Sequence, residues 1–62
     1  MNWRREGRDL WTAGPLTVYR ELDARSNTYL FELYSTTRFV AAYATLPEAM
    51  QRAEQLGWAV AV

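Results

Sequence analysis

The order of two hydrophobic periodicities restricts what this chain can fold into. Three short segments between residues 16 and 44 alternate apolar and polar side chains, which is the pattern of half-buried strands. Residues 45–57 then carry apolar side chains at the spacing of one helix face. A chain that changes once from strand to helix periodicity predicts an α+β domain, with one C-terminal helix packed on one face of an antiparallel sheet.

The alternating region 10–44 divides into three main strands. They are predicted over 16–22, 27–35 and 38–44. Gly14-Pro15 marks the turn before the first strand, and Thr36-Thr37 marks the turn before the third. Residues 10–13 and 58–62 are the candidates for an additional edge strand. Residues 1–9 are expected to form a polar arm, either irregular or a short edge strand.

The strand register predicts which side chains share a face. A four-residue loop over 23–26 would pair Val18 with Phe31 and place Arg20 over the ring of Tyr29. The next hairpin would pair Leu33 with Val40, and would leave Ala42 and Ala44 under the helix. The helix is then expected on Val18, Phe31, Leu33 and Val40. The opposite face would present Thr17, Tyr19, Glu21, Leu30, Glu32, Tyr34, Phe39, Ala41 and Tyr43.

The helix has a start signal and a stop signal. Thr45 and Glu48 stand three residues apart, as an N-cap and its capping-box partner do. Gly57 fits the left-handed position that ends a helix, and Trp58 is then expected to fold back on Ala53. The predicted apolar stripe is Leu46, Ala49, Met50, Ala53 and Leu56.

The small size of the chain limits its stability. Its 62 residues form a single domain, 1–62, that would bury only about 60% of the surface exposed on unfolding. The absence of Cys excludes a disulfide, and the absence of His makes a zinc site improbable. Because half of the residues are hydrophobic, we expect more apolar surface than one small core can bury. This composition favours a partner or a homodimer.

Residue types also narrow the chemistry. The chain has no His, Cys or Lys, so the usual general base, thiol nucleophile and Schiff-base amine are missing. We therefore expect no enzyme, no metal, no cofactor and no small-molecule ligand. A net charge of zero argues against a dedicated nucleic-acid binder. The start lacks a signal-peptide pattern, and no apolar run approaches the ~20 residues of a membrane span, so the expected location is cytoplasmic.

The second sheet face, with its aromatic side chains, has three interpretations. The N-terminal arm could fold over it, with Trp3 or Trp11 in the middle. A protein could dock there, since Tyr, Phe, Trp and Arg are enriched at the cores of interfaces. Unpaired bases could stack on the rings, although Glu21 and Glu32 would oppose phosphate.

The segments TVYREL, TYLFELYS, RFVAAYA and TLPEAMQRAEQL follow the order strand, strand, strand, capped helix. This order is similar to several families of small bacterial and phage proteins. The part from Phe39 to Leu56 resembles the end of the HicB-type antitoxin partial domain, where a strand leads into a helix that opens Thr-Leu-x-Glu-Ala. It also resembles the arm-type DNA-binding domain of tyrosine integrases. Thr36-Thr37 replaces the usual Pro-Gly turn of the first family, and glutamates replace the basic face of the second, so no functional residue is transferred.

The expected function is binding without catalysis. We expect a small inhibitor or adaptor of bacterial, phage or plasmid origin that binds another protein or itself. The expected contact residues are Tyr19, Leu30, Tyr34, Phe39 and Tyr43, with Trp3 and Trp11 at the margin. The alternative is a nucleic-acid-binding regulator that uses the same face together with Arg4, Arg5, Arg8 and Arg38.

Overall fold

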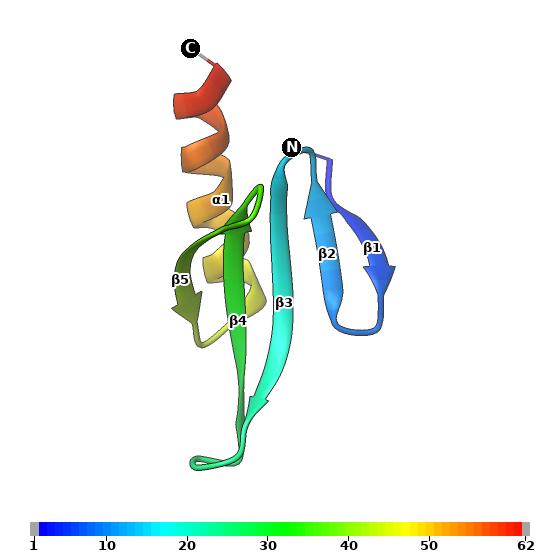
Figure 1. Cartoon of the computed structure of the whole chain (residues 1–62), viewed down its shortest axis with the longest axis vertical. Helices are drawn as coiled ribbons and strands as arrows, with labels where there is room; N and C mark the ends of the chain where they lie inside the picture. Colours follow the sequence, from blue (N-terminus) through cyan, green and yellow to red (C-terminus); the bar gives the residue numbers. More distant parts are fainter. Residues whose placement is uncertain (1, 62) are drawn as a thin grey trace.

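The computed structural model describes the backbone of residues 2–61 and the side chains of residues 2–57. Over this range five strands precede one helix (Figure 1). They are β1 (Arg4–Gly7), β2 (Leu10–Ala13), β3 (Leu16–Asp23), β4 (Thr28–Ser35), β5 (Arg38–Tyr43) and α1 (Leu46–Ala61). Each strand is antiparallel to the next, and their spatial order follows the chain. The predicted α+β class is confirmed.

The number of strands differs from the prediction of three main strands with one additional edge strand. β2 is an internal strand, and the middle of the predicted polar arm forms the edge strand β1. Gly14 makes this possible, since its φ of 60° suits the first position of the two-residue turn that joins Ala13 to Leu16. The N-terminal arm therefore widens the sheet at its edge and does not fold over a face.

The β3–β4 hairpin has the predicted faces but a different register. Its loop is shifted by one residue, to 24–27, and Val18 lies opposite Leu33 where Phe31 was expected. The Asp23 carboxylate holds this loop, because it accepts hydrogen bonds from the Arg25 N–H and the Ser26 hydroxyl, both at 3.1 Å. Asn27 follows with a φ of 57°. Each residue of β3 therefore pairs with a β4 residue two positions away from the predicted one. A change of two positions leaves the side chains of each pair on the predicted face.

A β-bulge in β5 changes the faces after the first two pairs. Phe39 lies opposite Tyr34, but Ala41 lies opposite Leu33, so Val40 is an extra residue. The predicted pairing of Leu33 with Val40 is therefore wrong. An extra residue reverses the alternation that follows it. The turn before the bulge is also unusual, because β-branched Thr36 has a φ of 58° and donates its N–H to the Pro15 carbonyl at 2.6 Å.

Because of the bulge, the residues after Val40 are not placed as the sequence predicted. Tyr43 lies opposite Phe31 on the helix side, and Ala41 lies on that side as well. Ala42 lies opposite Glu32 on the other side. Ala42 and Ala44 are both exposed, although they were expected under the helix.

The start and the apolar stripe of α1 are as predicted. The Glu48 N–H donates to the Thr45 hydroxyl oxygen at 3.4 Å, and that hydroxyl donates to Glu48 Oε1 at 2.8 Å. Ala49 and Ala53 are fully buried against the sheet, which their small side chains allow. The other stripe residues are partly buried against the same core: Leu46, Met50 and Leu56.

The helix does not end at Gly57. It continues to Ala61, so the alternative of an edge strand over 58–62 is wrong for residues 58–61. A glycine in a helix interior costs only about 1 kcal/mol relative to alanine, so one glycine does not force a helix to end. The predicted contact of the Trp58 side chain with Ala53 lies outside the described residues, as does Val62.

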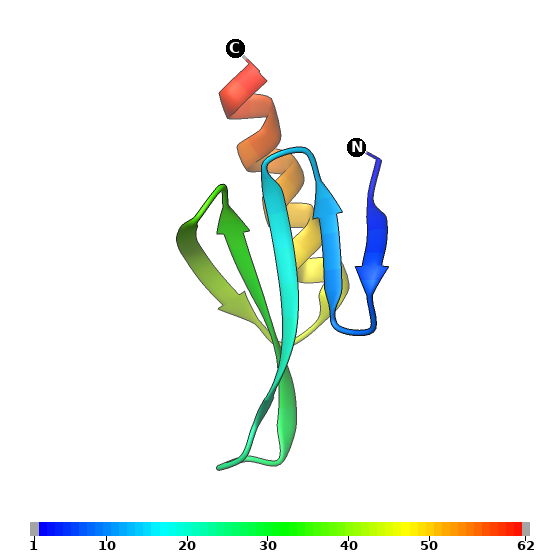
Figure 2. The ribbon, with the colours of Figure 1, turned by 45° about the vertical axis from the view of Figure 1, so that its right-hand side comes forward.

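The core lies between α1 and strands β2 to β4. Its buried residues are Trp11, Leu16, Val18, Leu33, Ala49 and Ala53, and Phe31 and Val40 pack against them as predicted. The helix lies on one side of the sheet, as Figure 2 shows. The far end of the β3–β4 hairpin extends beyond it, which gives the elongated shape of 39 × 20 × 20 Å. Within the described part of the chain, no helix has the length and apolar character needed to cross a membrane.

Candidate functional site

The candidate site is the side of the sheet opposite α1, which we call the open face. The helix contacts β3, β4 and β5 from the other side of the sheet. The strands contact only their neighbours in the sheet, so none of the described elements covers the open face. The register places these residues on the open face: Arg4, Leu10, Thr12, Thr17, Tyr19, Glu21, Leu30, Glu32, Tyr34, Phe39 and Ala42.

Three aromatic rings cross the open face in a row. The ring centroids of Tyr19 and Tyr34 are 5.5 Å apart, and those of Tyr34 and Phe39 are 5.6 Å apart. The interplanar angles of 89° and 70° are those of edge-to-face pairs, which the ring quadrupoles favour. Tyr19 is 45% exposed and Phe39 is 51% exposed. The row is therefore ordered by its own contacts while much of its surface faces solvent.

Two glutamates stand beside this row on the central strands. Tyr19 pairs with Glu32 and Glu21 pairs with Leu30, so the two glutamates are diagonal neighbours on one face. The pKa of Glu32 is raised above its ordinary value, first because its protonated carboxyl group can donate a hydrogen bond to Glu21, and further because of partial burial and the Glu21 charge. A pocket opens here, bordered by both glutamates and by Tyr19 and Tyr34.

Four of the predicted interface residues lie on the open face: Tyr19, Leu30, Tyr34 and Phe39. The other three lie on the helix side. The bulge moves Tyr43 there, and Trp11 follows Val18 to that side because the two residues are paired. Trp11 is a buried core residue, and Trp3 packs against the same core. The prediction that Trp3 and Trp11 border the aromatic face, or plug its middle, is wrong.

The arginines of the nucleic-acid alternative do not converge on one face. Arg4 lies at the β1 margin of the open face, with its Nε 3.7 Å from the Glu6 carboxylate. Arg5 lies on the helix side, with its guanidinium 5.2 Å from the centroid of the Trp11 ring. Arg8 lies in the β1–β2 turn. Arg38 pairs with Ser35 at the opposite edge of the sheet.

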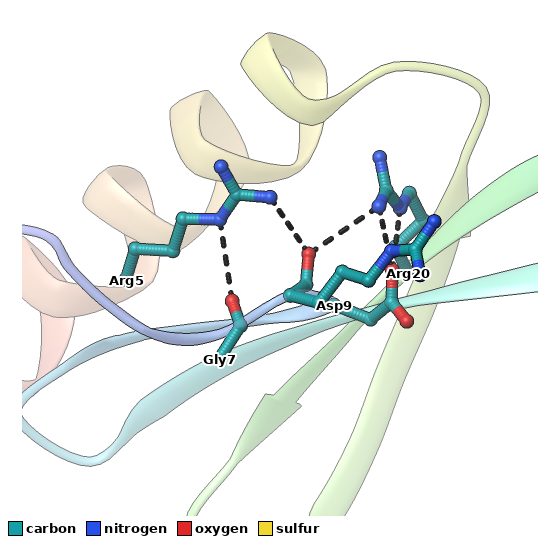
Figure 3. Close-up of polar contacts among 5 residues, drawn as sticks. Arg5, Gly7, Asp9 and Arg20 are labelled. Carbon is teal, nitrogen blue, oxygen red and sulfur yellow. Dashed lines mark hydrogen bonds and ion pairs between the residues drawn. The ribbon is translucent and has the colours of Figure 1, made fainter.

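Sequence reasoning missed a polar cluster on the helix side, which Figure 3 shows. Arg20 Nε donates to Asp9 Oδ1 at 2.7 Å, and Arg20 Nη2 donates to the Arg8 carbonyl at 3.3 Å. Arg5 Nη2 donates to the same carbonyl at 2.8 Å. The Arg20 guanidinium also lies 5.9 Å from the centroid of the Trp11 ring. The one signal in the sequence is that Arg20 interrupts an apolar strand face.

The predicted contact of Arg20 with Tyr29 is confirmed. The guanidinium lies 5.0 Å from the ring centroid, although Tyr29 pairs with Leu22 and the contact is diagonal. Leu22 is 51% exposed and Tyr29 is 52% exposed, because the hairpin end extends past the helix (Figure 1). We call this second exposed apolar surface, formed by Leu22 and Tyr29, the hairpin tip.

Comparison with protein families, curated proteins and solved structures found no match to this chain. The resemblance in element order covers three of the five strands and leaves β1 and β2 outside it. Within the described residues, no three acidic side chains lie close enough together to hold a metal ion.

Proposed function

We propose that this protein acts by binding another protein through the open face of its sheet, as a small inhibitor or adaptor without catalytic activity. The observation that carries the proposal is the row of Tyr19, Tyr34 and Phe39, which is held by edge-to-face contacts and whose two outer rings, Tyr19 and Phe39, are about half exposed. Rigid aromatic side chains supply large contact areas at little cost in conformational entropy. The cytoplasmic location and the bacterial, phage or plasmid origin stay predictions from the sequence.

The composition of the open face supports a protein partner more than nucleic acid. Its central charges are the carboxylates of Glu21 and Glu32, which would repel phosphate. The arginines that could offset them lie on different faces and edges, and Arg4 has an acidic neighbour in Glu6. Nucleic-acid binding therefore has less support than it had from the sequence alone.

The composition also argues against a homodimer through the open face. Glu21 and Glu32 lie on the central strands β3 and β4. A two-fold stack of this face on itself would bring four carboxylates into one buried layer, and burying unpaired charges is costly. A different protein with complementary charge avoids this cost.

Differential capture tests the proposed function. The wild-type protein and a Tyr19→Ser/Phe39→Ser variant would be immobilised and exposed to lysate of the source cells. A Leu22→Ser/Tyr29→Ser variant is the matched control, because it removes two equally exposed apolar side chains from the hairpin tip. We expect a protein that the wild type and the control retain and the open-face variant loses. Circular dichroism of each variant checks that the helix is intact.

Three results would contradict the proposal. The open-face variant could retain every species that the wild type retains. The tip variant could be the one that loses the partner, which would move the interface to the hairpin tip. Nuclease treatment could release the retained species, which would favour the nucleic-acid alternative.

A further inference from the structure

We propose that the partner of the open face presents an arginine or lysine side chain to the pocket between β3 and β4. Because it names the chemistry of that partner, the proposal rests on the function proposed above. The pocket is bordered by Tyr19, Arg20, Glu21, Glu32, Tyr34 and by the turn residues Thr36 and Thr37. Two carboxylates and two aromatic rings together match a cation better than any other side chain.

The two carboxylates are more favourable with a cation than without one. Glu21 and Glu32 are diagonal neighbours on one face and border the same pocket, and each carboxylate disfavours the charge of the other. The planar guanidinium of an arginine could donate to both carboxylates at once. Its approach would therefore replace a repulsion inside the protein by an attraction across the interface.

The tyrosine rings beside the carboxylates also favour a cationic side chain in the pocket. Tyr19 and Tyr34 meet edge to face at 5.5 Å, and both border the pocket. A guanidinium stacks on tyrosine rings and an ammonium is attracted to their faces. Aromatic side chains next to carboxylates thus fit both the charged end and the apolar stem of a long cationic side chain.

Two arginines of the protein that border the pocket or the open face have carboxylate partners elsewhere. Arg20 borders the pocket through its place on β3, but its guanidinium lies 2.7 Å from Asp9 on the helix side. Arg4 is separated from Glu32 by strands β2 and β3, and lies 3.7 Å from Glu6. These two guanidinium groups therefore do not offset the carboxylates of Glu21 and Glu32, and a cationic side chain of the partner would supply the complementary charge.

A peptide titration followed by NMR tests the chemistry directly. The probe is a blocked pentapeptide, acetyl-Gly-Thr-Arg-Thr-Gly-amide, and its control carries neutral citrulline in place of arginine. We expect the arginine peptide to shift the side-chain carboxyl signals of Glu21 and Glu32 and to lower the pKa of Glu32, since a nearby cation favours the ionised form. The citrulline peptide should do neither. Equal shifts with both peptides, or no shift with either, would overturn the proposal.

The captured partner supplies a second readout that separates this proposal from the proposed function. We expect Glu21→Gln/Glu32→Gln to weaken partner binding by about tenfold or more and to reduce its salt dependence. Glu54→Gln is the matched control, because Glu54 is exposed on α1. A partner that the Tyr19→Ser/Phe39→Ser variant loses, but the double glutamine variant binds at full strength, would overturn the cationic contact alone. A partner that both variants retain would overturn the proposed function as well.

Discussion

Charged side chains on the two faces of the sheet have different kinds of neighbours. On the helix side, Arg20 has a carboxylate at 2.7 Å, the Arg8 carbonyl at 3.3 Å and two aromatic rings within 6 Å. On the open face, Glu32 has Glu21, a group of the same charge. Arg20 is satisfied within the fold, whereas Glu32 is left beside a carboxylate of the same charge.

This contrast explains why aromatic residues play different parts in the two regions. Trp11 is a buried core side chain and also the surface on which two guanidinium groups stack. Tyr19 and Phe39 are half exposed, and contact other rings near unsatisfied charges. A domain this small cannot cover both faces with one helix, and the face that it leaves open keeps the less favourable groups.

The two faces should differ most in how much stability is lost when an aromatic side chain is replaced by alanine. Trp11→Ala removes a core side chain and should cost about 3–5 kcal/mol, which is comparable to the whole stability that such a small core provides. We expect this variant to be unfolded. Phe39→Ala should cost about 1 kcal/mol or less, because its ring is half exposed. Urea unfolding measures both, and equal losses would remove the distinction between a core face and an open face.

The second largest effect is expected for Tyr43, which is compared with Tyr19 on the open face. The bulge at Val40 places Tyr43 on the helix side, where it packs against the core. We expect Tyr43→Ala to lower the free energy of unfolding by about 2 kcal/mol. Tyr19→Ala should lower it by less than half as much. If thermal unfolding gave equal losses for the two variants, Tyr43 would belong to the open face and the strand would be regular.

A smaller effect is expected when the satisfied cation is changed. Arg20→Lys keeps the charge but loses the planar group that contacts Asp9 and two rings. The free energy of unfolding should fall by about 1 kcal/mol. Arg25→Lys, in the exposed β3–β4 turn, should leave it unchanged. A loss of the same size at Arg25 would mean that the Arg20 contacts add nothing specific.

The smallest expected effect concerns the unsatisfied anion and depends on pH. The folded-state pKa of Glu32 is raised above its ordinary value, so its favourable contribution is complete in acid, below the ordinary pKa, and is lost as the pH rises through the raised pKa. Glu32→Gln does not titrate. At neutral pH it should be more stable than the wild type by a few tenths of a kcal/mol, relative to their difference in acid. Denaturation across this pH range provides the test, and a pH-independent difference would contradict the raised pKa.

Local signals predicted much of the fold. Gly14-Pro15 marks a turn, Thr45 with Glu48 starts the helix, and the faces of β3 and β4 follow from alternation because a shift of one residue in both strands preserves them. The features that were predicted wrongly, such as the bulge in β5, depend on how strands fit one another and not on local sequence. Every residue from Phe39 to Tyr43 is apolar, so no polar position marks Val40 as an extra residue.

The same limit applies to the candidate site. Tyr19, Tyr34 and Phe39 could be assigned to one face because each precedes the bulge or lies on another strand. Tyr43 could not, since its side depends on how β5 fits β4. Trp11 could have been placed correctly only after β2 was known to pair with β3 through a regular two-residue turn.

Both edges of the sheet carry an irregularity. In β1, Arg5 lies opposite Trp11 and Gly7 lies opposite Leu10, so Glu6 is an extra residue, as Val40 is in β5. A bulge interrupts the row of backbone donors and acceptors that another strand would need for regular pairing, and charged residues on β1 discourage it further. The sheet is therefore poorly suited to grow by adding strands from other chains. This protects an aromatic-rich domain from aggregation and leaves its surfaces, rather than its edges, for recognition.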